Sequence, residues 1–160
     1  MIIESTDGLA NVHEIASASG RIDSLLFGAV DMSADLRAEK TWETLLYARS
    51  SVVHAAARVG LDLLDVPYLN LDDPDGLAEE ARMSSALGFT GKAAIHPKQI
   101  PTLNAAFTPD AERLAYARRV ISAFENGDSG LVVIDGKLIE KPVLRAMYRL
   151  VVVAEAAGIV

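Results

Sequence analysis

Two carboxylates that follow short apolar segments offer the clearest chemistry in this sequence. Glu4 ends the apolar run 1–3, and Asp31 ends the run 25–30. A continuous apolar run is typical of a strand that is buried on both faces of a parallel sheet. Two such strands, each ending in one acid, would bring both carboxylates to the same rim of the sheet. The sequence therefore predicts a metal or acid–base site that contains Glu4 and Asp31.

A paired carboxylate site of this kind suits Mg²⁺, which takes one or two protein carboxylates and completes its octahedron with water and substrate oxygens. A 2-oxo or 2-hydroxy acid that chelates the ion would have its carbonyl polarised during carbon–carbon cleavage. The alternative is that Glu4 and Asp31 are solvated acids, or that they cap the helices that follow them. The spacing alone leaves both interpretations open.

Two further pairs of residues are candidates for ligand binding. Gly28 and Ala29, just before Asp31, would let backbone N–H groups approach a substrate carboxylate, unless they form only a tight turn. Lys92 and Lys98 flank the end of an expected strand, where they would contact a nucleotide or pantetheine phosphate or remain solvated. His96, which precedes a proline, is expected to make a structural hydrogen bond and not to act as a base.

Alternating strand and helix patterns must position these side chains. Alternation of this kind implies right-handed crossovers and a parallel sheet. A loop with five charged residues is expected over 29–40, and Pro97 suits the first position of a further helix. The expected strands are 1–5, 22–28, 61–71 and 91–96, and the expected helices between them are 9–19, 41–59 and 77–87.

The pattern changes after residue 107. Thr108 as N-cap and Pro109 at the first helical position predict a helix that extends to about residue 126. A turn at 127–130 precedes a small hairpin over 131–139 through Asp135-Gly136, and a last helix follows over 142–157. We therefore expect two domains: four βα units in 1–107, and a helix–hairpin–helix extension in 108–160 that contacts another subunit.

Length and composition restrict the class of protein. The chain has 160 residues, whereas a closed (β/α)8 barrel usually needs about 250. A net charge of −7 argues against nucleic acid as the main partner. The absence of cysteine excludes disulfides and thiolate metal sites, and it fits the cytoplasm. No apolar run approaches the roughly 18 residues of a membrane span, and the first residues lack the basic region of a signal peptide.

Four segments of the chain form a recognisable set when they are taken together and in order. They are Ile3-Glu4-Ser5-Thr6, the stretch from Phe27 to Leu36, the stretch from Gly88 to Gln99, and Asp135-Gly136-Lys137-Leu138-Ile139-Glu140-Lys141-Pro142. Together they resemble the citrate lyase β-subunit family. This family groups the citryl, malyl and methylmalyl thioester lyases with the HpcH/HpaI aldolases. The similarity extends along essentially all of the chain, and no single motif would carry it alone.

The resemblance implies a TIM barrel of which the last four strands are present here, so the expected fold is a C-terminal half-barrel with an extension. It also implies that Glu4 and Asp31 bind Mg²⁺. Glu140 stands where the thioester lyases usually have an aspartate that acts in a neighbouring subunit's site, and it is one methylene longer. Val30 departs from the family's glutamate at that position. The family's substrate-carboxylate arginine belongs to the first half-barrel and has no counterpart here.

Two functions from different classes follow. The first is a Mg²⁺-dependent carbon–carbon lyase that cleaves a 3-hydroxyacyl thioester, carried on coenzyme A or an acyl carrier protein, into a 2-oxo acid and an acetyl-type thioester. The alternative is a catalytically incomplete half-barrel that serves as an assembly or interaction subunit. Both predict exposed strand edges, which favour a homo-oligomer or a partner chain that supplies the missing half.

Overall fold

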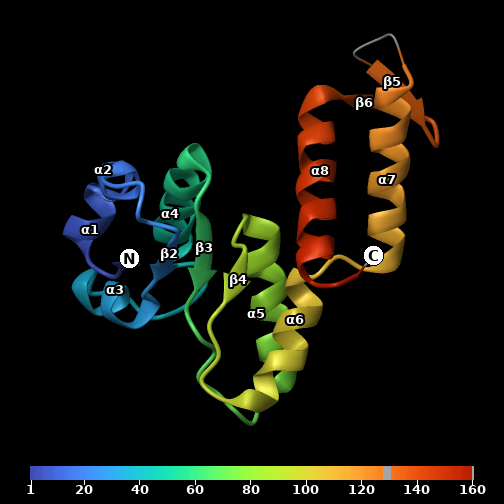
Figure 1. The fold of residues 1–160 in the computed structure, drawn as a ribbon. Helices are drawn as coiled ribbons and strands as arrows, with labels where there is room; N and C mark the ends of the chain where they lie inside the picture. Colours follow the sequence, from blue (N-terminus) through green and yellow to red (C-terminus); the bar gives the residue numbers. More distant parts are fainter. Residues whose placement is uncertain (128–130, 160) are drawn as a thin grey trace. The chain divides into compact units, whose positions relative to one another are not determined.

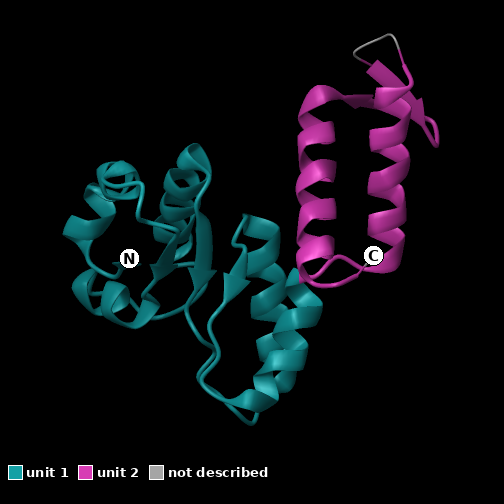
Figure 2. Cartoon of the chain, viewed as in Figure 1, with its two compact units in different colours: residues 1–107 teal, residues 108–160 magenta. Residues whose placement is uncertain are grey.

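A computed structural model describes residues 1–127 and 131–159. The chain forms two compact units, Met1–Phe107 and Thr108–Val160, which are coloured separately in Figure 2. Most of the turn that the sequence predicts at 127–130 lies outside the described residues. Among the described residues, each helix is too short or too polar to span a membrane.

Unit 1 contains a four-stranded sheet, within the described residues, whose strands lie side by side in chain order. Every neighbouring pair is parallel, so the predicted parallel α/β arrangement is confirmed. The strands are shorter than predicted; the third ends before Pro67, which lacks a backbone N–H for the ladder. They are β1 (Ile2–Ile3), β2 (Ser24–Phe27), β3 (Asp62–Asp65) and β4 (Gly91–Lys92).

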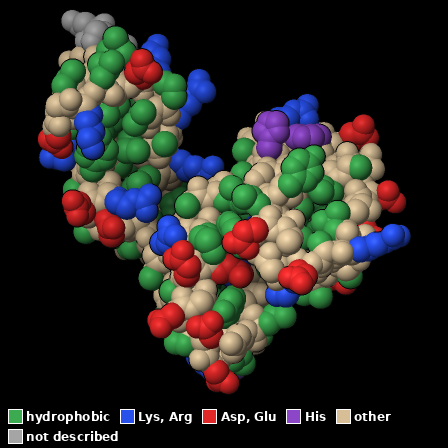
Figure 3. Space-filling model, turned by 180° about the vertical axis from the view of Figure 1, so that it is seen from behind, with side chains coloured by type: hydrophobic (Ala, Val, Ile, Leu, Met, Phe, Trp, Pro, Cys, Tyr) green, Lys and Arg blue, Asp and Glu red, His purple; other side chains and the backbone are tan. Residues whose placement is uncertain are grey.

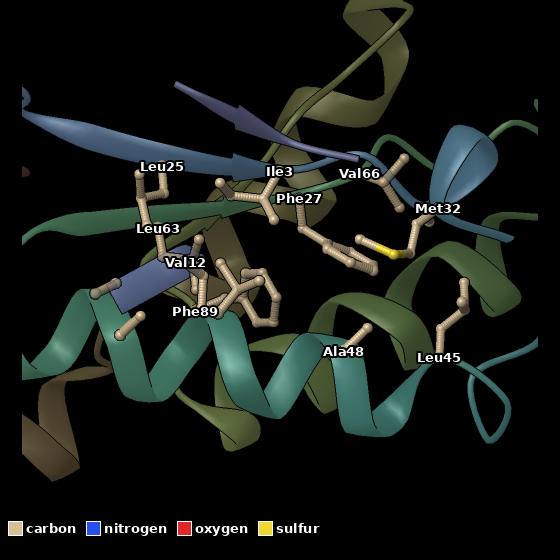
Figure 4. Packing of buried hydrophobic residues seen from close by; sticks show 14 of the residues in the cluster. Ile3, Val12, Leu25, Phe27, Met32, Leu45, Ala48, Leu63, Val66 and Phe89 are labelled. Atoms are coloured by element: carbon tan, nitrogen blue, oxygen red, sulfur yellow. The ribbon is translucent and has the colours of Figure 1, made fainter. Parts of the chain in front are cut away.

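Helices connect these strands, and Figure 1 shows how they are arranged around the sheet. The helices of unit 1 are α1 (Thr6–Ala10), α2 (Val12–Ser17), α3 (Ala29–Asp35), α4 (Leu46–Val59), α5 (Pro74–Leu87), the short 3-10 helix η1 (Pro97–Gln99) and α6 (Ile100–Phe107). Side chains from β1, β2 and β3 pack with α2 and α4 in the main core. In Figure 4, Leu25, Phe27 and Leu63 extend from the strands toward α4, which carries Ala48.

The prediction of a loop over 29–40 is wrong for its first part, because α3 occupies residues 29–35. Ala29, Met32 and Ser33 are buried, at the i, i+3 and i+4 positions of one helix face. The intervening charges at Asp31 and Asp35 obscured this short apolar face in the sequence. The carboxylate predicted at a strand end therefore lies in the first turn of a helix.

Two predicted helices have different bounds. The helix predicted over 9–19 is divided at Asn11, which ends α1 and precedes α2. The helix predicted from residue 41 begins only at Leu46. Before it, the hydroxyls of Thr41 and Thr44 hydrogen-bond to each other and to nearby backbone groups, which satisfies the chain locally without a helix.

Unit 2 consists of two helices joined by the predicted hairpin. The elements are α7 (Ala111–Glu125), β5 (Leu131–Ile134), β6 (Lys137–Glu140) and α8 (Lys141–Ala156). Asp135 and Gly136 both have positive φ, as a two-residue turn of this type requires. The N-cap of α7 is Asp110 and not the predicted Thr108, because the Asp110 carboxylate accepts a hydrogen bond from the backbone N–H of Arg113 at 2.7 Å.

Candidate active site

Glu4 and Gly28 lie side by side where β1 and β2 end. Ile3 pairs with Phe27, and the backbone N–H of Gly28 donates to the carbonyl of Ile3 at 2.9 Å. A Cβ atom added to Gly28 would be 2.5 Å from Cβ of Glu4 and 3.0 Å from its Oε2. Glycine is thus required at this position because the Glu4 side chain occupies the space that a larger residue would fill.

Asp31 lies three residues after Gly28, at the start of the helix α3. Gly28 is the N-cap of α3, Ala29 is its first residue, and Asp31 lies in its first turn. The partial positive charge of a helix N-terminus favours a carboxylate at this position. Both Glu4 and Asp31 are exposed, so solvent and small ligands reach their oxygens.

A hydrogen-bonded clamp holds the segments that carry these two acids. The backbone N–H and the hydroxyl of Thr6 both donate to Oδ2 of Asp35, at 2.5 and 2.7 Å. Thr6 is two residues after Glu4, and Asp35 is one helical turn after Asp31. The hydrogen bond from the Thr6 backbone, followed by that from its hydroxyl, lowers the pKa of the Asp35 carboxyl.

These residues fit a magnesium ion by the chemistry of their donors. Glu4 directly follows β1, Asp31 lies in the first turn of the helix that follows β2, and the bare backbone of Gly28 leaves room for the Glu4 side chain. Among the described residues there is no group of three or more His, Cys, Asp or Glu side chains that could hold a metal. A hard cation that keeps most of its water and substrate ligands suits such a sparse, oxygen-only donor set, whereas a structural zinc site does not.

A buried ionic cluster, which sequence reasoning missed, lies at the ends of β3 and β4. Asp65, the last residue of β3, accepts from Nε of Arg49 at 3.2 Å and from Nζ of Lys92 at 2.8 Å. The Ser84 hydroxyl donates to Asp65 at 2.6 Å, and Lys92 also contacts Glu80 at 2.6 Å. We call these five residues the Asp65 cluster. It ties β3, β4, α4 and α5 together.

Burial raises the pKa of the Asp65 carboxyl, but the charges of Lys92 and Arg49 and the hydrogen bonds from Lys92 and Ser84 outweigh burial. The net result is a pKa below the ordinary range for aspartate. Asp65 is therefore ionised, and two cations and two carboxylates balance one another within the cluster.

Arg49 links this cluster to the end of β2. Its guanidinium lies 5.1 Å from the ring centre of Phe27, the residue before Gly28, and 4.5 Å from that of Trp42. Its Nη1 is the one buried side-chain nitrogen or oxygen without a hydrogen-bond partner among the described residues. One sequence signal could have revealed it: Arg49 occupies the apolar face of α4, four residues after Leu45 and three before Val52.

The other predicted site residues lie in varied environments. Lys92 is buried, and its ammonium is shared by Asp65 and Glu80. Lys98 is about half exposed, with Nζ 3.8 Å from an oxygen of Asp72. His96 makes the expected structural hydrogen bond, in which Nδ1 accepts from the backbone N–H of Lys98. Glu140 lies in unit 2, at the exposed N-cap position of α8.

Comparison with known proteins identifies the family to which the chain belongs. The family model described as HpcH/HpaI aldolase/citrate lyase matches residues 1–97. The chain belongs to this family. Citrate lyase subunit beta of Leuconostoc mesenteroides subsp. cremoris is 33% identical over 99% of this chain and 54% of its own length. L-malyl-CoA/beta-methylmalyl-CoA lyase of Cereibacter sphaeroides is 33% identical over 88% of this chain and 51% of its own length.

Solved structures give the same result. Protein CitE from Mycobacterium tuberculosis, in complex with magnesium, acetoacetate and coenzyme A, is 32% identical, with a TM-score of 0.81 over 96% of this chain and 60% of that one. RipC from Yersinia pestis is 46% identical, with a TM-score of 0.69 over 71% of this chain and 53% of that one. The chain spans about half the length of the curated relatives that it matches.

Proposed function

We propose that this chain carries the magnesium-binding part of a carbon–carbon lyase that acts on a 3-hydroxyacyl thioester. The observation that carries the proposal is the close approach of the Glu4 side chain to the bare backbone of Gly28. Gly28 is the N-cap of α3, and Asp31 lies in the first turn of the same helix. Family membership and the magnesium named in the CitE complex support it. Cleavage would give a 2-oxo acid and an acetyl-type thioester.

In this proposal, Glu4 and Asp31 hold the metal through carboxylate oxygens. When bound, Mg²⁺ supplies Lewis acidity to the carbonyl that develops during cleavage. Ala29 binds the carboxylate of the 2-oxo acid through its backbone N–H at the start of α3, where the helix favours an anion. Gly28, whose own N–H donates to the carbonyl of Ile3, contributes only the open space that its missing side chain leaves. The Thr6–Asp35 clamp keeps the segments that carry the two acids in place.

The remaining roles depend on the resemblance. Glu140 is proposed to exchange a proton with the thioester enolate in a neighbouring subunit's site. Lys98 is proposed to bind a phosphate of coenzyme A or of an acyl carrier protein's pantetheine, because its ammonium is accessible. Lys92 is not included in this part of the proposal, since two carboxylates already share its buried ammonium.

A calorimetric titration with Mg²⁺, in the presence of oxaloacetate or pyruvate, tests the metal site. We expect Glu4→Gln and Asp31→Asn each to weaken Mg²⁺ binding at least tenfold, because each removes a charged oxygen ligand. Glu14→Gln removes an exposed acid elsewhere in unit 1 and should leave binding unchanged. Equal binding by the wild type and both site variants would contradict the proposed metal site.

A second function, assembly with another chain, is favoured by the face of the sheet that carries Ile2, Leu26 and Leu64, which we call the open face. In the described sheet, β1 and β4 each have one neighbouring strand only, and Ile2 of β1 is 56% exposed. Unpaired strand edges and exposed apolar side chains favour association. We propose that two copies, or this chain and a partner with the corresponding strands, associate through this side and complete a barrel-like core.

Light scattering on purified protein tests this second function. We expect a dimer or larger assembly, and we expect Ile2→Lys to shift the protein toward the monomer by placing a charge on the apolar side. Tyr47→Lys, at an exposed apolar position of α4, is the matched control and should not alter the mass. A monodisperse wild-type monomer would count against association and favour a sheet that is stable alone.

A further inference from the structure

Two histidines that the proposed function does not use lie in contact on the surface of unit 1. His13 of α2 and His54 of α4 have ring centres 5.2 Å apart, with an angle of 81° between the ring planes. Figure 3 shows histidine side chains gathered in one purple patch. Together they are two of the three histidines in the sequence.

The helices beneath the two rings are well anchored. Val12 and Ala16 of α2 are buried in the main core, together with Val52 and Ala55 of α4. His13 directly follows one of these buried residues, and His54 lies between the other two. The two imidazoles are therefore held near each other by packed helices and not by flexible loops.

We propose that His13 and His54 form a binding site for a borderline divalent transition cation of the Zn²⁺ type. Imidazole nitrogens bind Zn²⁺ at about 2.0–2.1 Å, so two imidazoles on one tetrahedral ion place their ring centres roughly 5 Å apart. The observed separation of 5.2 Å matches this distance, and rotation of the rings about their side-chain bonds would direct one nitrogen of each toward a shared ion. A T-shaped contact between two rings is the competing explanation.

The ligand count defines the kind of site. No group of three or more potential metal-binding side chains occurs in the described parts of the chain, so water completes the coordination shell. Imidazole suits Zn²⁺, Cu²⁺ and Ni²⁺, whereas Mg²⁺ prefers oxygen ligands. This site and the proposed Glu4–Asp31 site therefore select different metals and act independently. An ion that joins α2 to α4 binds the folded state and stabilises unit 1.

Titration of the untagged chain with Zn²⁺ alone, in a non-chelating buffer, tests the site by calorimetry and by thermal unfolding. We expect Zn²⁺ to raise the unfolding temperature of the wild type. His13→Gln and His54→Gln should each weaken binding at least tenfold and remove the thermal shift. His96→Gln removes the histidine that lies elsewhere and should behave as the wild type. Glu4→Gln should also retain the site, which separates this result from any failure of the magnesium proposal.

NMR spectra of the histidine rings provide a readout that does not depend on the variants folding. In the wild type, Zn²⁺ should shift the ring signals of His13 and His54 and leave those of His96 unchanged. Equal shifts of all three histidines, or wild-type affinity in His54→Gln, would overturn the proposal and leave the pair as an aromatic contact.

Discussion

The two faces of the sheet in unit 1 are built from the same strands, but they differ in how far helices cover them. On one face, Leu25, Phe27 and Leu63 pack into the core against the helices, together with the buried Asp65 cluster. On the other face, the register aligns Ile2, Leu26, Leu64 and Gly91 in one row. Within the described residues, the first face is covered by helices, and we call it the closed face; the second is the open face.

This difference shows why the site residues lie where they do. Successive side chains of a strand point to opposite faces, so Glu4 shares the open face with Ile2, and Gly28 shares it with Leu26. Asp65 shares the helix-covered face with Leu63. Carboxylates near the ends of two strands of one sheet, β1 and β3, thus have opposite roles: Glu4 is accessible to ligands, and Asp65 is enclosed by cations.

The largest expected effect comes from breaking the closed face. Asp65→Asn removes the charge that Arg49 and Lys92 require, and an unpaired buried charge costs about 3–5 kcal/mol of unfolding free energy. Asp62→Asn, in the same strand but on an exposed position, should change stability by less than about 0.5 kcal/mol. Urea unfolding of both variants measures the difference. Equal stabilities would show that the Asp65 cluster does not support this face.

The comparison also shows what the sequence could and could not reveal. Local signals were sufficient for the four parallel strands, the Asp135-Gly136 hairpin and the placement of Glu4 at the end of the first strand, because apolar runs and turn residues are read directly. The placement of Asp31 at a strand end was wrong. The short helix α3 was missed because its apolar face is brief and interrupted by acids. The Asp65 cluster was missed because its members come from four elements, and their pairing depends on tertiary packing.

A smaller effect is expected at the rim of the open face. Gly28→Ala would place a methyl group 2.5 Å from Cβ of Glu4, and overpacking of this kind costs about 1–3 kcal/mol. Gly20→Ala is the control, since an added Cβ at Gly20 would have no atom within 4 Å. Thermal unfolding compares the two. If Gly28→Ala is as stable as the control, then Glu4 is free to move away, and the fixed position that we propose for this ligand would be wrong.

The smallest effect concerns the exposed Thr6–Asp35 clamp, which joins the segment after Glu4 to the end of α3. The Thr6 backbone and hydroxyl hydrogen bonds lower the pKa of Asp35 in the folded state, so its contribution is fully present above the ordinary aspartate pKa of about 3.9. That contribution is lost as the pH falls through the folded-state pKa, because the protonated acid is a weaker acceptor. Asp35→Asn should therefore lower stability at pH 6 and converge with the wild type in acid. Urea midpoints measured from neutral pH down to about pH 3 test this sign. Parallel curves for the two proteins would mean that hydrogen bonding to Thr6 is not linked to protonation of Asp35, and that the clamp makes no pH-dependent contribution to stability.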